Sequence, residues 1–181
     1  MVVRKVNISG IIIIEPDVFR DSRGAFTELW NSTRLAAEGV PGTFVQDNVS
    51  WSVKGVLRGL HFQNPAAQGK LISVLMGEVF DVTVDLRRDS PTFGKWHGEE
   101  LSRESLRQIY IPPGFAHGFV VLSDQAVFHY KCTAAYNKNS EKTLLWNDPD
   151  LGIDWPVKNP VVSEKDRGGK FLKQFSASEL F

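Results

Sequence analysis

The sequence predicts an all-β jelly roll, that is, a double-stranded β-helix with a few short helices. Short runs rich in Val, Ile, Phe and Tyr recur between breaks of Gly, Pro, Asn or Asp, which is the pattern of a sandwich or barrel. Helical periodicity is limited to two short stretches. With 181 residues, of which 42% are hydrophobic, the chain is long enough for one buried core. We therefore expect a single domain over residues 1–181.

Turn residues separate the expected strands. Gly77, Pro91 and Pro113-Gly114 stand at points where the chain is expected to reverse or to leave a strand. The expected strands cover residues 10–14, 25–30, 44–52, 56–63, 71–76, 78–86, 96–101, 107–111, 118–122 and 126–133.

This pattern leaves only two short stretches in which a helix is expected. A short helix is expected over residues 32–38, with Asn31 or Ser32 as its cap and Gly39 as its stop signal. Another is expected to begin within residues 163–167.

Composition excludes several classes of partner. Lys plus Arg equals Asp plus Glu at 21 each, so no overall charge favours nucleic acid or an anionic membrane, and any anion site must be local. Cys132 is the only cysteine, which rules out an internal disulfide and suits a reducing compartment. The run of four Ile before Glu15 is too short for a signal peptide or a membrane span. We expect a cytoplasmic protein.

Residues 55–70 contain three side chains that could act in catalysis or binding. Arg58, His61 and Lys70 could act as an anion clamp, a proton-transfer group and a fixed positive charge. A base next to a cation suits carbon acids, because an ammonium stabilises the enolate left by proton removal. The alternative is that His61 is a satisfied strand histidine and Arg58 a solvated surface charge.

Strand alternation sorts these side chains by face. Tyr130 shares an inward face with Phe128 and Cys132. A buried tyrosine needs a hydrogen-bond partner for its hydroxyl, so the alternative to a functional role is a core tyrosine tied to the backbone. Arg58 and His61 are three residues apart and would fall on opposite faces of a regular strand. One shared pocket therefore requires a bulge, for which Gly59 is the natural place.

A metal site is not expected. Metal-binding cupins show His-x-His followed by Glu, and then a distant His after a Pro-x-Gly turn. Here the first motif has Gln63 as its second member and Lys70 near the place of the carboxylate, whereas the second motif keeps His117. An ammonium repels the cation that such a site should attract. This departure favours acid–base chemistry without metal.

Runs along nearly the whole chain resemble those of one enzyme family. They are FVQDN, GVLRGLHFQ, QGKL, GEVFDVTVD, RRDSPTFGKW, IPPGFAHGFVVLS, FHYKCT, LWNDPDLGIDWP and SEKDR. In these runs and their spacing the chain is similar to the dTDP-4-dehydrorhamnose 3,5-epimerase family, which acts in dTDP-L-rhamnose synthesis. The resemblance implies a cupin-type jelly roll, a homodimer and no metal or organic cofactor.

The resemblance also implies roles for particular residues. His61 would remove the C5 and C3 protons, Asp166 would orient it, Tyr130 would be the acid on the opposite ring face, and Lys70 would steady the enolate. The N-terminal DSRG segment would reach the pocket of the partner subunit. The nucleotide and sugar would be held by Arg23, Phe26, Glu28, Gln46, Asp47, Asn48, Arg58, His117, Tyr136, Glu141 and Lys165.

Two other readings stay open. A related cupin could invert only C3 or only C5, or act as a 3,4-ketoisomerase, with the same base and acid in a differently tilted pocket. A non-catalytic nucleotide-sugar binder would keep Arg23 and Arg58 but would not need Tyr130 or the pair of His61 and Asp166. The joint presence of these three favours an enzyme.

Overall fold

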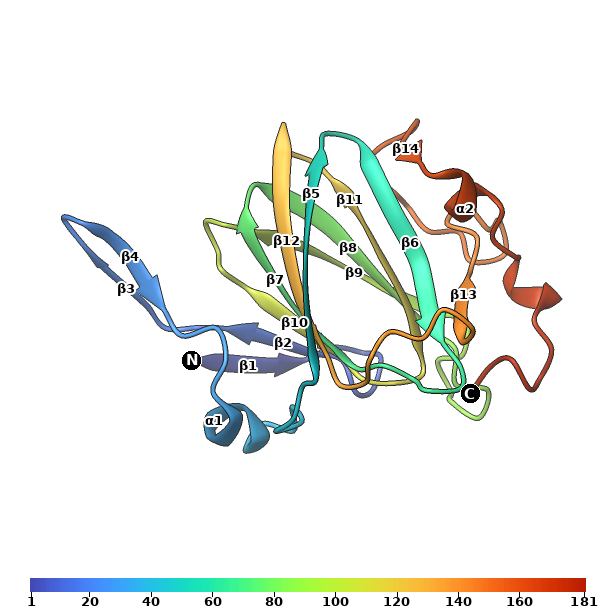
Figure 1. Ribbon diagram of the computed structural model, residues 1–181, viewed down its shortest axis with the longest axis horizontal. Helices are drawn as coiled ribbons and strands as arrows, with labels where there is room; N and C mark the ends of the chain where they lie inside the picture. The colour runs from blue at the N-terminus through green and yellow to red at the C-terminus, as the bar shows by residue number, and fades with distance from the viewer.

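Two facing β-sheets and a projecting hairpin make up the computed structural model, which describes residues 1–181 (Figure 1). The first sheet has the order β1 (Val2–Lys5), β2 (Ile12–Glu15), β10 (Gln108–Ile111), β7 (Lys70–Met76), β12 (Gln125–Cys132) and β5 (Gln46–Val53). The second has the order β13 (Glu141–Thr143), β6 (Val56–Gln63), β11 (Phe115–Val121), β8 (Glu78–Asp85) and β9 (Trp96–Ser102), with β14 (Val161–Val162) parallel to β6. The predicted jelly roll is confirmed.

The observed strands begin and end close to the expected positions where clear turn residues flank them. The expected strand over 56–63 coincides with β6. Four strands were not expected: β1, β13, β14 and β3 (Val18–Asp21). Each has four residues or fewer, so neither alternation nor a run of β-branched residues could mark it.

The main core fills one end of the space between the sheets. Ile13, Ile72 and Val74 face Val79 and Leu101 across it, and all are essentially inaccessible. Phe119 of β11 stacks on Phe128 of β12, with ring centroids 3.9 Å apart. Because apolar side chains fill only this end, the inner faces of both sheets can turn polar at the other end.

A second cluster lies behind the second sheet. Leu60, Phe62 and Val82 point away from the first sheet and pack against Leu151 and Phe175 from the C-terminal part of the chain. This packing of its outer face holds β6 in place. Its inward side chains, His61 among them, are therefore well positioned.

The hairpin of β3 and β4 (Gly24–Thr27) leaves the body of the protein as an arm. Figure 1 shows it extending beyond both sheets. Phe19 and Phe26 on this arm are 64% and 69% exposed. Such aromatic exposure on a detached hairpin is typical of a segment that another chain covers.

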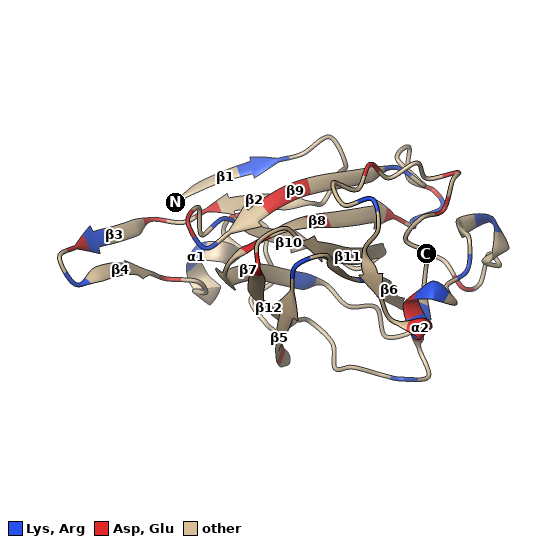
Figure 2. Cartoon of the chain, turned by 90° about the horizontal axis from the view of Figure 1, so that it is seen from above, with Lys and Arg blue, Asp and Glu red and all other residues tan.

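Short helices lie where the sequence predicted them. Helix α1 (Ser32–Ala36) is capped by Asn31 rather than Ser32, because the Asn31 side chain accepts from the backbone N–H of Arg34. Helix α2 (Glu164–Arg167) is capped by Ser163, and a 3₁₀ turn, η1 (Leu172–Gln174), follows. Basic and acidic residues are both spread over the molecule, and α2 carries both signs (Figure 2).

Candidate functional site

A cleft of about 720 Å³ opens between the two sheets at the polar end of the sandwich. Its walls are the inner faces of β5, β7 and β12 on one side and of β6 and β11 on the other, with the Val161–Asp166 segment at its edge. This volume is in the range of pockets that enclose small ligands.

His61 forms a short pair with Asp166. Its Nε2 lies 2.6 Å from Asp166 Oδ1, and Asp166 Oδ2 accepts the backbone N–H of Gly59 at 3.3 Å. Ser163 at the start of α2 holds the backbone N–H of Asp166 with its hydroxyl at 3.1 Å. The helix cap thus aims a buried carboxylate at the imidazole from a distant part of the chain.

The charge of Asp166 decides which ring nitrogen of His61 carries the proton. Burial alone would raise the pKa of the Asp166 carboxyl, but the hydrogen bond and charge of His61 and the Gly59 N–H lower it below its ordinary value. An ionised carboxylate only accepts hydrogen bonds, so Nε2 of His61 carries the proton. Nδ1 is then the free basic nitrogen.

The bulge that Arg58 and His61 require is present. Across β6 and β11, His117 pairs with His61 and Phe119 pairs with Arg58, so β6 holds one extra residue between them. Gly59 lies there with φ near +113°, and a Cβ on it would come within 2.6 Å of the His117 carbonyl oxygen. The bulge turns Arg58 and His61 to the same pocket.

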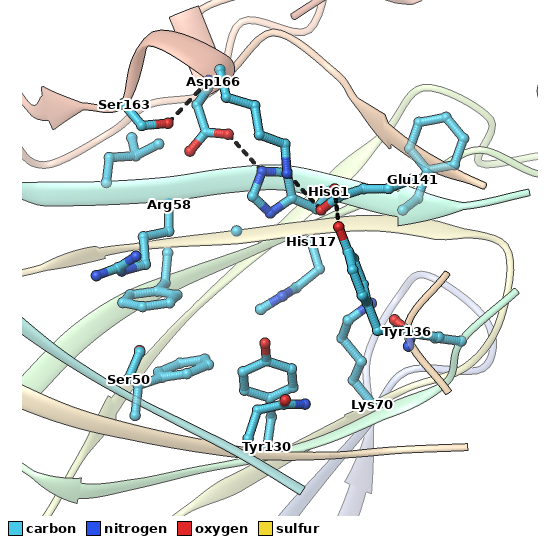
Figure 3. A pocket seen from close by; sticks show the side chains of 18 of the residues that line it. Ser50, Arg58, His61, Lys70, His117, Tyr130, Tyr136, Glu141, Ser163 and Asp166 are labelled. Carbon is cyan, nitrogen blue, oxygen red and sulfur yellow. Dashed lines mark hydrogen bonds and ion pairs between the residues drawn. The ribbon is translucent and has the colours of Figure 1, made fainter. Parts of the chain in front are cut away.

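Tyr130 faces His61 from the opposite sheet (Figure 3). Its hydroxyl makes no hydrogen bond within the protein, so the alternative of a core tyrosine tied to the backbone is wrong. Burial raises the pKa of its phenol. Tyr130 therefore keeps its proton and can donate it across the cleft.

Lys70 lines the pocket and makes no ion pair. It is only 8% exposed. Burial lowers the pKa of its ammonium, and the nearby charges of Cys132, Asp81 and Glu141 oppose that shift. His117 lies beside it on the pocket floor, held by Asp81 at 2.7 Å.

The inner face of β5 forms a polar wall. Gln46 donates to Asn48 at 2.9 Å and accepts the backbone N–H of Tyr136 at 2.7 Å. Farther along the strand, Ser52 accepts the Nε–H of Arg58 at 3.0 Å. This contact leaves the terminal amino groups of the guanidinium free for an anion.

A chain of polar contacts closes the rim. Tyr136 donates its hydroxyl to Glu141 at 2.9 Å, and Lys165 lies 2.6 Å from the same carboxylate. Burial acts to raise the pKa of Glu141, but the hydrogen bonds of Lys165 and Tyr136 lower it. All three residues line the cleft.

Four of the candidate residues lie elsewhere. Arg23 and Phe26 are on the arm, where Arg23 pairs with Asp21, and Glu28 follows the arm and pairs with Arg34. Asp47 points to the outer face of β5 and binds Lys131. The other candidates, His61, Tyr130, Asp166, Lys70, Gln46, Asn48, Arg58, His117, Tyr136, Glu141 and Lys165, line the cleft.

Sequence reasoning missed three supports of the site. Ser50 and Ser52 continue the alternation that Gln46 and Asn48 begin on β5, and this pattern could have identified them. Asp81 alternates inward with Thr83 in β8, but nothing local shows which side chain it meets.

No group of three or more His, Cys, Asp or Glu side chains is arranged to hold a metal ion. None of the helices has the length and apolar character that crossing a membrane requires.

Comparison with known proteins gives consistent results. The family model described as dTDP-4-dehydrorhamnose 3,5-epimerase matches residues 5–174. The epimerase of that name from Pseudomonas aeruginosa is 56% identical, with 92% of this chain and 93% of that one covered. A crystal structure of the Legionella pneumophila 3,5-epimerase in complex with dTDP-4-keto-L-rhamnose superposes with a TM-score of 0.96 at 50% identity, covering 98% of this chain and 96% of that chain. A dTDP-4-dehydrorhamnose 3-epimerase from Streptomyces niveus is 39% identical, with 96% and 85% covered.

Proposed function

This chain belongs to the dTDP-4-dehydrorhamnose 3,5-epimerase family, and from that membership we propose how its pocket performs the reaction. The protein is an isomerase that converts dTDP-4-dehydro-6-deoxy-D-glucose to dTDP-4-dehydro-L-rhamnose in dTDP-L-rhamnose biosynthesis. The observation that carries the mechanism is the His61–Asp166 pair facing Tyr130 across the cleft.

His61 is the base. The C4 ketone acidifies the C–H bonds at C3 and C5, so a single base could serve both positions if the ring shifts between steps. Nδ1 of His61 takes the proton, and the charge that develops on the imidazole is balanced by Asp166 at 2.6 Å. The pair resembles the His–Asp arrangement of other general bases, in which the carboxylate orients the ring.

Tyr130 is the acid. Inversion requires a proton to arrive on the ring face opposite to the one it left, and Tyr130 lies on the opposite wall. Its protonated phenol supplies that proton. Lys70 places an ammonium near the enolate oxygen at C4, where preorganised positive charge stabilises the intermediate.

The nucleotide is held by the polar walls. Arg58 binds the diphosphate through its free amino groups, while Gln46, Asn48, Glu141 and Lys165 contact the nucleoside and sugar and Tyr136 stacks on thymine. Their positions along the cleft support this assignment. We propose that no metal or organic cofactor takes part, so that prolonged chelation leaves turnover unchanged.

We also propose a homodimer in which the arm is exchanged. The Arg23 side chain is 88% exposed near the hairpin tip, and Phe19 and Phe26 lie with ring centroids 6.4 Å apart and largely uncovered. Trp51 on the outer face of β5 is 70% exposed. A second copy that receives the arm would cover these rings. The arm would then carry Arg23, Phe26 and Glu28 of one subunit to the pocket of the other. We place this assembly in the cytoplasm.

The reaction at each carbon is tested by proton NMR. The protein is incubated with dTDP-4-keto-6-deoxyglucose in D₂O, and exchange and inversion are followed separately at C3 and C5. Deuterium at both positions with inverted product supports the 3,5-epimerase. Change at C3 alone would favour the activity named for the Streptomyces niveus relative, and binding without exchange would leave a nucleotide-sugar binder.

A further inference from the structure

Asp81 is a buried acid beside the pocket that has no part in the mechanism above. Its side chain is 1% exposed, and its Oδ2 lies 2.7 Å from Nε2 of His117. The other oxygen, Oδ1, is buried and meets no hydrogen-bond donor of the protein. Burying a carboxylate is costly unless strong contacts compensate, and an apolar residue would fill this place without that cost.

His117 and His61 are neighbours on adjacent strands. They are register partners on β11 and β6, and both imidazoles enter the cleft (Figure 3). Each has its Nε2 bound to a buried carboxylate, Asp81 or Asp166. The pocket thus contains two histidine–aspartate pairs side by side, of which the proposed mechanism uses one.

The ring of His117 is fixed from a second side. It stacks on Phe128, with centroids 6.1 Å apart and planes at 21°. Nε2 is engaged by Asp81, whereas Nδ1 makes no hydrogen bond within the protein. Because His117 lines the cleft, Nδ1 is the nitrogen available to a ligand.

We propose that Asp81 is a positioning residue that holds His117 in the Nε2–H tautomer, so that the lone pair of Nδ1 accepts a hydrogen bond from a hydroxyl of the hexose. This role rests on the proposed function, because the hexose must lie between His61 and Tyr130. An ionised carboxylate can only accept, which selects this tautomer. The same carboxylate is a counter-charge for Lys70, whose ammonium has no ion pair.

The tautomer of His117 is directly measurable in the wild-type protein. Correlation of ring ¹⁵N and ¹H signals, assigned among the four histidines, is expected to show a protonated Nε2 and an unprotonated Nδ1 for His117. A protonated Nδ1 in the free wild-type enzyme would overturn the proposal, whether or not any variant folds.

Asp81→Asn tests the consequence for activity. The amide can donate to Nε2, so His117 is expected to change to the Nδ1–H tautomer, and kcat is expected to fall about 10- to 100-fold. Affinity for dTDP, which lacks the hexose, should stay within about twofold. Thr83→Val is the matched control, because Thr83 is the register partner of His117 on the same face of β8, and its hydroxyl is buried without a hydrogen bond to His117 or to any other group.

The outcomes separate this proposal from the proposed function. Wild-type turnover with an unchanged His117 tautomer and unchanged kcat in Asp81→Asn would overturn the positioning role alone. Absence of wild-type turnover would overturn the proposed function, while the tautomer measurement would still stand on its own. Equal losses in Asp81→Asn and Thr83→Val would show that the site is sensitive only to packing, and would also overturn the proposal.

Discussion

At the scale of single residues, the chemistry depends on which groups have their hydrogen bonds satisfied. His61 is engaged at Nε2 and free at Nδ1, while Tyr130 and Lys70 have no partner in the protein. Replacing His61 with Asn should abolish deuterium exchange at both C3 and C5, because it removes the basic nitrogen that faces Tyr130 across the cleft. Binding of dTDP, measured by calorimetry, should remain near the wild-type value. Exchange at a near wild-type rate would remove His61 from the role of base.

Tyr130→Phe separates the proposed acid from the proposed base. The change removes only the hydroxyl, so His61 should still take protons out and return them to the same ring face. Deuterium is expected to enter C5 while net inversion falls by roughly 10²- to 10⁴-fold, the usual contribution of an acid–base group. Both rates are read from the same NMR time course. Equal loss of exchange and inversion would instead point to placement of the substrate, and Tyr136 would be the next phenol to test.

At the scale of elements, one glycine determines that two side chains of β6, Arg58 and His61, point into the same cleft. Gly59 carries the bulge, with φ near +113° and no room for a Cβ beside the backbone of β11. Gly59→Ala should therefore destabilise the fold by about 1–3 kcal/mol and lower turnover, because Arg58 and His61 lose their shared face. Thermal unfolding measures the first effect. Gly42→Ala is the control, since its Cβ would meet nothing within 4 Å; equal melting temperatures in the two variants would argue against a strained bulge.

At the scale of the whole molecule, the question is where the arm acts. In the proposed arm-exchanged dimer, mixing inactive His61→Asn protomers with inactive Arg23→Ala protomers should restore about a quarter of wild-type activity, because half of the dimers would then be mixed and each would have one complete pocket. Subunit exchange is verified by mass spectrometry of labelled chains. Verified exchange without any recovery would mean that Arg23 serves its own chain.

The sequence by itself determined the class of fold, most strand positions and the bulge. Alternation of apolar and polar residues fixes which face of a strand is buried, and Gly59 was the one residue that could reconcile Arg58 with His61. Both helices were also expected, one with Asn31 or Ser32 as its cap and one beginning within residues 163–167, and the structure assigns the caps to Asn31 and Ser163. Asp166 was identified through the family resemblance of SEKDR, whereas strand alternation put Tyr130 on an inward face and only the resemblance of FHYKCT implied its role as the acid.

Only the tertiary structure decided which of these groups meet. Asp166 reaches His61 from 105 residues away and Asp81 reaches His117 from 36, and no local pattern encodes such pairs because packing of the two sheets creates them. The same packing placed Asp47 on the outer face of β5 and carried Arg23, Phe26 and Glu28 away from the cleft of their own chain. Periodicity specifies the face of a strand, whereas the partner of a side chain depends on how the elements come together in space.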